Sequence, residues 1–152
     1  MFNFFKKKMA VAKIDKTEFF IAPERKHRTD AGLDLYIPYS FTLRGKATTI
    51  VNINLAVKIP HGYVGLIFPR SSISCKGVHV CTGVVDEGFA GEIKVVVKNM
   101  DKRPKRFEQG FRIAQLVVVP CWFGDTEEVE HQDLINSSVG TRGTSGYGST
   151  GK

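Results

Sequence analysis

The chain has 152 residues, 42% of them hydrophobic, and a formal net charge of +7. Its length and composition are those of a single globular domain with a sizeable core, and no stretch approaches the roughly 18 apolar residues of a membrane helix. The 3 cysteines include no C-x-x-C pair, which argues against a disulfide framework or a zinc site and favours reduced thiols in a cytoplasmic protein.

Positive side chains are concentrated in two regions. Residues 1–30 carry 8 positive and 4 negative side chains, and residues 101–112 carry 5 and 2. Such surfaces attract anions, whether nucleic acid, acidic lipid or a small polyphosphate. The second region offers only Phe107 and Phe111 as stacking platforms, so we expect a solvated loop that steers anions rather than a nucleic-acid interface.

Short segments rich in β-branched and aromatic residues, separated by turn residues, predict a mainly β fold, either a barrel or a jelly-roll-like sandwich. The clearest pattern lies in residues 48–59, where every second residue from Val51 to Ile59 is apolar. This alternation predicts one half-buried strand. Further strands are predicted at 10–14, 63–68, 78–85, 92–99 and 112–120.

Two other segments complete the predicted domain. Residues 71–76 can form one helical turn, and residues 125–139 are expected to form a strand followed by an extended arm. From Ser137 onward there are almost no core-forming side chains, so we expect residues 1–136 to fold as the domain and residues 137–152 to be mobile in isolation.

The segment GYGSTGK, Gly146 to Lys152, has the spacing G-x-x-x-x-G-K of a phosphate-binding P-loop. A P-loop continues into a helix whose Ser or Thr binds magnesium. No residues remain here for such a helix, so this glycine-rich segment requires another explanation.

Five short motifs supply that explanation when they are taken together. In this order and spacing they resemble the five motifs of the homotrimeric dUTP pyrophosphatase (dUTPase) family, over about residues 23–152. The resemblance implies a jelly-roll-like β-barrel that hydrolyses dUTP to dUMP and pyrophosphate with Mg²⁺, as a homotrimer without a membrane partner. The motifs are AGLDLY (31–36), PRSSIS (69–74), TGVVDEGFAGEI (82–93), GFRIAQL (110–116) and RGTSGYGSTG (142–151).

The resemblance assigns catalytic roles to side chains in four of these motifs. Asp86 matches the base that orients and deprotonates the attacking water, which suits a carboxylate fixed near a tight turn. Arg70 and Ser71 match phosphate ligands, Ser71 at the α–β bridging oxygen. Gln115 matches a contact to the α-phosphate, and Asp34 a carboxylate that reaches magnesium through its water ligands.

The nucleoside would be recognised mainly by the shape of its binding site and by hydrogen bonds from backbone groups. Phe89 stands where the family usually has Tyr, and its ring would lie under the deoxyribose and exclude a 2′-hydroxyl. A hairpin would pair its backbone with the uracil edge and exclude the thymine methyl. This expected hairpin comprises Val80, Cys81, Thr82, Gly83, Val84 and Val85.

The C-terminal segment resembles the family's arm, which closes over a nucleotide on a neighbouring subunit. Arg142 would bind the outer phosphates and Tyr147 would stack on uracil. Gly148 would let the backbone approach closely, and Ser149 and Thr150 would cap the γ-phosphate. The nucleotide itself would then order the arm, so the phosphate-binding sequence needs no helix behind it.

One position departs from the family pattern. The fourth motif usually reads Gly, acid, Arg, and here it reads Gly110, Phe111, Arg112. The missing carboxylate would normally pair with a nearby arginine. How Arg70 or Arg112 is oriented is therefore an open question at this point.

Two alternatives remain at the level of sequence. A dCTP deaminase shares this fold, but its catalytic Glu would fall at Val96, which cannot transfer protons. A regulatory role, in which a dUTPase-like trimer binds a protein partner, leaves no general motif and stays open.

Overall fold

The computed structural model of the protein describes residues 8–137. It divides the chain into two compact units, Met1–Trp122 and Phe123–Lys152. The strands of the described residues all belong to the first unit, and α2 (His131–Ser137) belongs to the second. The boundary expected at Ser137 lies within the second unit, and the role of residues 137–152 as an arm stays a prediction.

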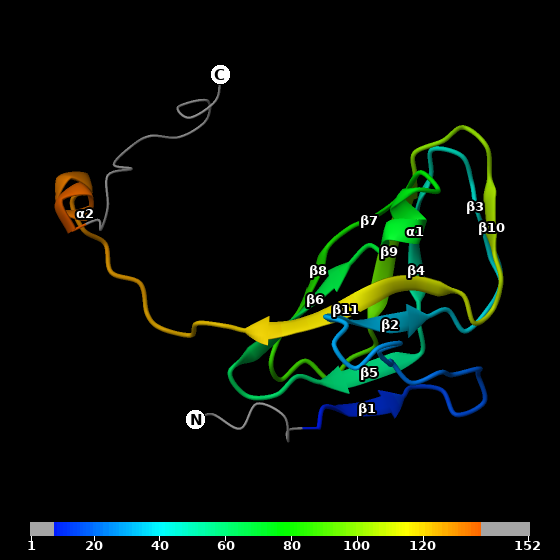
Figure 1. Ribbon diagram of the computed structural model, residues 1–152, viewed down its shortest axis with the longest axis horizontal. Coiled ribbons are helices and arrows are strands. Elements are labelled where there is room, and N and C mark those ends of the chain that lie inside the picture. Colours follow the sequence, from blue (N-terminus) through cyan, green and yellow to red (C-terminus); the bar gives the residue numbers. More distant parts are fainter. Residues whose placement is uncertain (1–7, 138–152) are drawn as a thin grey trace. The chain divides into compact units, whose positions relative to one another are not determined.

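A four-stranded antiparallel sheet carries most of the predicted motifs. Its strand order is β2-β11-β6-β8, with the long strand β11 paired to both β2 and β6, as can be followed in Figure 1. This arrangement brings the first, second and fourth motifs together. The strands are β2 (Gly32–Tyr36), β6 (Tyr63–Phe68), β8 (Gly83–Val85) and β11 (Arg112–Pro120).

One three-stranded sheet and two strand pairs complete the domain. The sheet has the order β4-β9-β7, and the pairs are β1-β5 and β3-β10. The predicted mainly β class is confirmed. These strands are β1 (Ala10–Lys13), β3 (Phe41–Leu43), β4 (Thr48–Asn52), β5 (Leu55–Lys58), β7 (Val78–Val80), β9 (Lys94–Asn99) and β10 (Lys105–Phe107).

The inner faces of the sheets form a common hydrophobic core. Leu35, Val51, Val95 and Leu116, each from a different strand, are fully buried within it. Burial of such a side chain stabilises the fold by about 1.5–3 kcal/mol. The residues predicted to point inward from Val51 to Ile59 are all buried, but the alternation is not complete, because Asn54 and Ala56, expected on the opposite face, are buried as well.

Residues 48–59 nevertheless form two strands, so the prediction of a single strand was wrong. β4 pairs with β9, whereas β5 pairs with β1. Between them Asn54 adopts a φ of 52°, a left-handed conformation that Asn tolerates. Its buried amide oxygen accepts the Asp15 N–H at 2.7 Å, and its nitrogen donates to the Asp15 carbonyl. These contacts stabilise the bend and give both polar atoms of the buried Asn54 side chain a partner.

Most of the other predicted elements are observed, and one is not. The strands predicted at 10–14, 63–68, 92–99 and 112–120 are observed as β1, β6, β9 and β11, and the turn predicted at 71–76 is α1 (Ser71–Ser74). The strand predicted within 125–139 is wrong, because the described part of that segment ends in α2. Asp133 lies in the first turn of α2, where a negative charge is favoured, and Gln132 donates to Asn136 one turn later at 3.0 Å.

No helix among residues 8–137 combines the length and the apolar character needed to cross a bilayer.

Candidate active site

Asp34 lies at the centre of the site. Its carboxylate is largely buried and contacts two guanidinium groups, Arg70 Nε at 2.7 Å and Arg112 Nη1 at 3.0 Å. The two arginines contact different oxygens, Oδ1 and Oδ2. A buried carboxylate is costly unless it is paired, so this double contact both satisfies Asp34 and fixes both arginines.

This geometry answers the question raised by Phe111. The acid that the fourth motif lacks is not needed to orient Arg70 or Arg112, because Asp34 holds both. The Phe111 ring instead packs against Phe107 with ring centroids 5.2 Å apart, and Phe107 stacks on Phe41 at 5.3 Å. Phe111 therefore belongs to an aromatic cluster and contributes hydrophobic packing.

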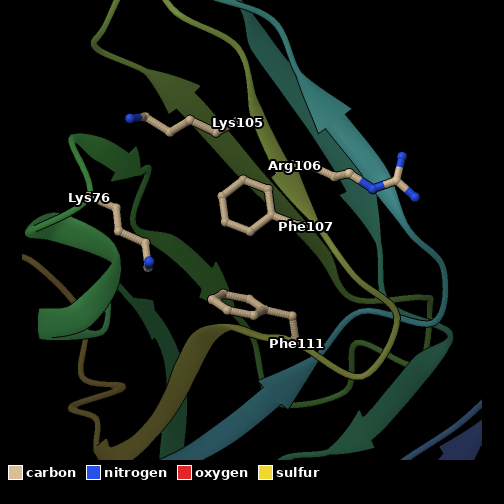
Figure 2. Close-up of a pocket in the computed structure, with 5 residues that line it drawn as sticks. All are labelled: Lys76, Lys105, Arg106, Phe107 and Phe111. Carbon is tan, nitrogen blue, oxygen red and sulfur yellow. The ribbon is translucent and has the colours of Figure 1, made fainter.

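Figure 2 shows the side chains that line a pocket at this cluster. Phe107 and Phe111 line a pocket together with Lys76, Lys105 and Arg106. Lys105 pairs with Asp101, and Arg106 pairs with Glu108 at 2.6 Å. Two of the three cations that line this pocket are thus balanced by acids of the same chain.

Gln115 is placed by the pairing of three strands. On β11 it lies opposite Asp34 of β2 and opposite Phe68 of β6. Its Nε2 donates to the Pro69 carbonyl at 2.8 Å. A Cβ at Gly32 would lie 2.2 Å from Gln115 Oε1, so this Gln115 conformation requires glycine at position 32.

These side chains line one open pocket of about 290 Å³. It brings together four of the predicted residues, Asp34, Arg70, Ser71 and Gln115, and adds Arg112. Ser71 is the first residue of α1 and follows directly after Arg70. The structure therefore gathers the first, second and fourth motifs, which are far apart in sequence.

Lys26 and Asp30 also line this pocket, although neither was predicted as a site residue. Their loop is closed by Arg25 Nε, which donates to the Asp30 carbonyl at 2.7 Å, and by the His27 N–H, which donates to Asp30 Oδ2 at 2.9 Å. The sequence feature that could have pointed to Lys26 was the positive charge just before the first motif. With 3 cationic and 2 anionic side chains in its lining, the pocket favours anions.

The segment 80–85 is not the hairpin that we predicted. Val80 ends β7, which pairs with β9, whereas Gly83 begins β8, which pairs with β6. The chain thus crosses from one sheet to the other, and the Cys81 N–H donates to the Val96 carbonyl at 2.9 Å. Because β8 is the last strand of its sheet in the described part of the chain, one of its edges pairs with no other strand there.

Asp86 follows β8 directly and is exposed. It begins a turn in which the Phe89 N–H donates to the Asp86 carbonyl at 3.2 Å and Gly88 has a φ of 91°. The Phe89 ring is 45% exposed, so it is not a core side chain. A Cβ at Gly91 would lie 2.7 Å from this ring, so Gly91 makes room for the ring.

Neither Asp86, Phe89 nor the 80–85 segment is among the residues that line the Asp34 pocket. Within residues 8–137 the structure thus contains two separate parts of the predicted site. The predicted arm residues Arg142, Tyr147, Gly148, Ser149 and Thr150 lie outside the described residues.

Tyr36 and Glu24 lie next to the Asp34 pocket. The Tyr36 hydroxyl donates to Glu24 Oε1 at 3.0 Å. Burial raises the pKa of Tyr36, and the hydrogen bond to Glu24 raises it further. The phenol therefore stays protonated and keeps donating this bond, which ties β2 to the preceding segment.

The dUTPase family model matches residues 18–151 of the chain. The chain belongs to the dUTPase family. The deoxyuridine 5′-triphosphate nucleotidohydrolase of Corynebacterium jeikeium is 41% identical over 133 residues, which cover 85% of this chain and 84% of that one. The rat protein of the same name is 36% identical over 137 residues, covering 90% of this chain and 64% of the rat chain.

Solved dUTPase structures have the same fold. The dUTPase of Staphylococcus bacteriophage 80alpha with dUpNHpp superposes with a TM-score of 0.84 at 31% identity, covering 95% of this chain and 99% of that chain. A dUTPase mutant from phage phi11 of S. aureus, which coordinates a structural Mg(II) ion, gives a TM-score of 0.75 at 28% identity, covering 82% and 97%. The predicted dUTPase-type fold is thereby confirmed, and dCTP deamination is not favoured.

Proposed function

We propose that this dUTPase hydrolyses dUTP to dUMP and pyrophosphate in a site to which the Asp34 pocket contributes the phosphate ligands. The observation that carries this proposal is the contact of one buried carboxylate with both Arg70 and Arg112, beside Ser71 and Gln115. A pocket with fixed guanidinium groups is suited to a polyphosphate. Family membership and relatives named for dUTP hydrolysis support the same substrate.

Arg70 is poised to bind phosphate while it stays anchored. Its Nε is engaged by Asp34 at 2.7 Å, whereas within residues 8–137 the Nη1 atom makes only long contacts, at 3.5 Å, to Ser72 Oγ and to the Arg112 carbonyl. The outer nitrogens can therefore turn to phosphate oxygens without breaking the Asp34 contact. Ser71 donates to the α–β bridging oxygen, where negative charge grows as pyrophosphate leaves.

Asp86 is the base in this proposal. It orients a water for in-line attack on the α-phosphorus and accepts its proton. Since Asp86 does not line the Asp34 pocket, the Asp86 turn of one subunit completes the pocket of another within a homotrimer. Phe89, in the same turn, closes against the deoxyribose and excludes a 2′-hydroxyl.

Uracil recognition uses backbone groups of residues 80–85. β8 is an edge strand, and the open edge of a strand presents N–H and C=O groups to a partner. The polar edge of uracil can pair with such groups. From the neighbouring subunit, Tyr147 stacks on the base and Arg142 binds the outer phosphates. Gly148 lets the backbone approach closely, and Ser149 and Thr150 cap the γ-phosphate.

Magnesium fits this site only as an ion bound mainly by the substrate. Both oxygens of Asp34 already accept guanidinium donors, and residues 8–137 contain no cluster of three or more His, Cys, Asp or Glu side chains that could hold a metal. Asp34 would therefore contact water ligands of the ion rather than the ion itself. When bound, Mg²⁺ neutralises phosphate charge.

A product assay tests this function. The purified protein is incubated with Mg²⁺ and either dUTP or dCTP, and dUMP, pyrophosphate and ammonia are quantified. We expect dUMP and pyrophosphate in equal amounts from dUTP, with the Asp86→Asn variant reduced at least ~100-fold in kcat. Release of ammonia from dCTP, or no turnover of dUTP, would overturn the proposal.

A further inference from the structure

The pairing of β6 with β8 stops just before Asp86. The register is Ile67 with Gly83, Leu66 with Val84, and Gly65 with Val85. Asp86 is the next residue and already belongs to the turn at Gly88. Strand pairing alone therefore does not fix the position of the Asp86 side chain.

The side chain of Glu87 continues the connection past the end of the strand. Its Oε2 accepts the Gly62 N–H at 2.9 Å, and its Oε1 contacts His61 Nδ1 at 2.7 Å. Residues 61–62 lie in the turn that leads into β6, the partner strand of β8. Glu87 thus ties the turn that holds Asp86 to the turn at the adjacent end of β6.

Gly62 is itself held firmly. Its carbonyl accepts the Cys121 N–H at 3.0 Å, directly after the end of β11. Its φ is 83°, a conformation that favours glycine. The Gly62 residue is therefore bound through its N–H by Glu87 and through its carbonyl by Cys121, and gives Glu87 a fixed point of attachment.

The contacts of Glu87 to His61 and to Gly62 differ in how strongly they hold the Glu87 side chain. The His61 side chain is 89% exposed, and an exposed ion pair contributes little. The Glu87 side chain is only 29% exposed, and a carboxylate that accepts a backbone N–H forms a charge-assisted bond. Of these two contacts, the one to Gly62 therefore contributes more to holding Glu87 in place.

We infer that Glu87 is the positioning residue for Asp86. It acts through the backbone of the turn and does not touch the substrate. The inference rests on the proposed role of Asp86 in dUTP hydrolysis. Because small errors in the placement of a base reduce the rate of the chemical step, loss of the Glu87 contact should lower kcat and leave KM nearly unchanged.

Single variants of Glu87 and His61 give the first test of this positioning role. Glu87→Ala removes the contact, and Glu87→Asp keeps the charge but is one methylene too short to reach Gly62. We expect each to lower kcat about 10-fold, with KM within about twofold and Tm within a few degrees of the wild type. Glu87→Gln retains an oxygen that can accept the Gly62 N–H but loses the charge, so its kcat should lie between the values of Glu87→Ala and the wild type. His61→Ala should change kcat less than about twofold.

Glu18→Ala is the matched control. It removes an exposed acid of the same size that has no role in the site, and it should leave kcat unchanged. The decisive comparison is Glu87→Ala in the Asp86→Asn background, measured at high enzyme concentration. A residue that acts only through Asp86 adds no further loss there.

Several results would overturn the inference. They are a wild-type kcat in Glu87→Ala, a rise of KM at constant kcat, no rescue by Glu87→Gln, and a full additional loss in the Asp86→Asn background. A wild-type protein that leaves dUTP intact would overturn the proposed function together with this inference. A protein that is active with Asp86 and indifferent to Glu87 would overturn the inference alone.

Discussion

Asp34 and Arg70 form an ion pair of 2.7 Å between side chains that are only 13% and 21% exposed. Asp34 lies on β2 and Arg70 follows the end of β6 by two residues, and these strands are not neighbours but flank β11 on either side. The pair therefore depends on correct assembly of the central sheet. It links the stability of the fold to the orientation of a proposed phosphate ligand.

Replacing Asp34 by Asn should uncouple the two arginines. The amide keeps the size of the side chain but loses the charge and one acceptor, so Arg70 and Arg112 lose their common partner. We expect kcat/KM for dUTP to fall at least ~10-fold and the free energy of unfolding to fall by about 1–3 kcal/mol. Steady-state kinetics and urea denaturation measure the two effects. An Asn variant with wild-type kinetics would show that Asp34 does not orient Arg70.

Gly32→Ala should disturb the site through Gln115. The new Cβ would lie 2.2 Å from Gln115 Oε1, so Gln115 must move and lose its bond to the Pro69 carbonyl. We expect a loss of about 1–3 kcal/mol in the free energy of unfolding together with lower kcat/KM. In the double variant with Gln115→Ala the clash with the Gln115 amide is gone and only a tight approach of 3.0 Å to Cβ remains, so Tm should recover at least in part while activity stays low. A double variant no more stable than Gly32→Ala would refute this cause.

Phe111→Ala should separate stability from activity. The ring packs on Phe107 and is partly buried, so its removal should cost about 2–3 kcal/mol in the free energy of unfolding. Since Asp34 orients both arginines, kcat for dUTP at a temperature where the variant is folded should stay within about threefold of the wild type. A large loss of kcat without unfolding would mean that Phe111 supports Arg112 after all.

Removal of residues 140–152 tests the predicted arm. None of the removed residues is core-forming in type, so the truncated protein should fold with a similar Tm. It should still bind dUMP, but turnover of dUTP should fall ~100-fold or more, because closure over the phosphates and the stack on uracil are lost. Calorimetry and kinetics on the truncated chain give these values. Full activity without the arm would contradict the roles of Arg142 and Tyr147.

Local patterns in the sequence predicted some of the strands, whereas β3 and β10 were not predicted and the segments 48–59 and 78–85 each form two strands. β6, β9 and β11 follow from short runs of β-branched residues, and the inward residues from Val51 to Ile59 follow from period-two alternation. The bend at Asn54 does not follow from that pattern, because it depends on a bond to Asp15, a partner 39 residues away. The same alternation is compatible with one strand or two.

The sequence predicted which residues form the site but not how these residues contact one another. The motifs identified Asp34, Arg70, Ser71 and Gln115, which line one pocket. The pairing of Asp34 with both arginines could not be predicted from the sequence, because in the family the acid that pairs with a nearby arginine usually stands at the position of Phe111. The role of Glu87 was likewise missed, because its partner Gly62 acts through a backbone N–H that leaves no side-chain signature.

The central claim is that the Asp34 pocket of one subunit and the Asp86 turn of another complete a single site for dUTP. The most direct measurement mixes two variants that are each inactive, Arg70→Ala and Asp86→Asn, under conditions in which subunits exchange. Random trimers should then contain intact sites at about a quarter of the positions, so kcat per subunit should return to about a quarter of the wild-type value. A mixture as inactive as either variant alone, in trimers shown to have exchanged subunits, would contradict the claim.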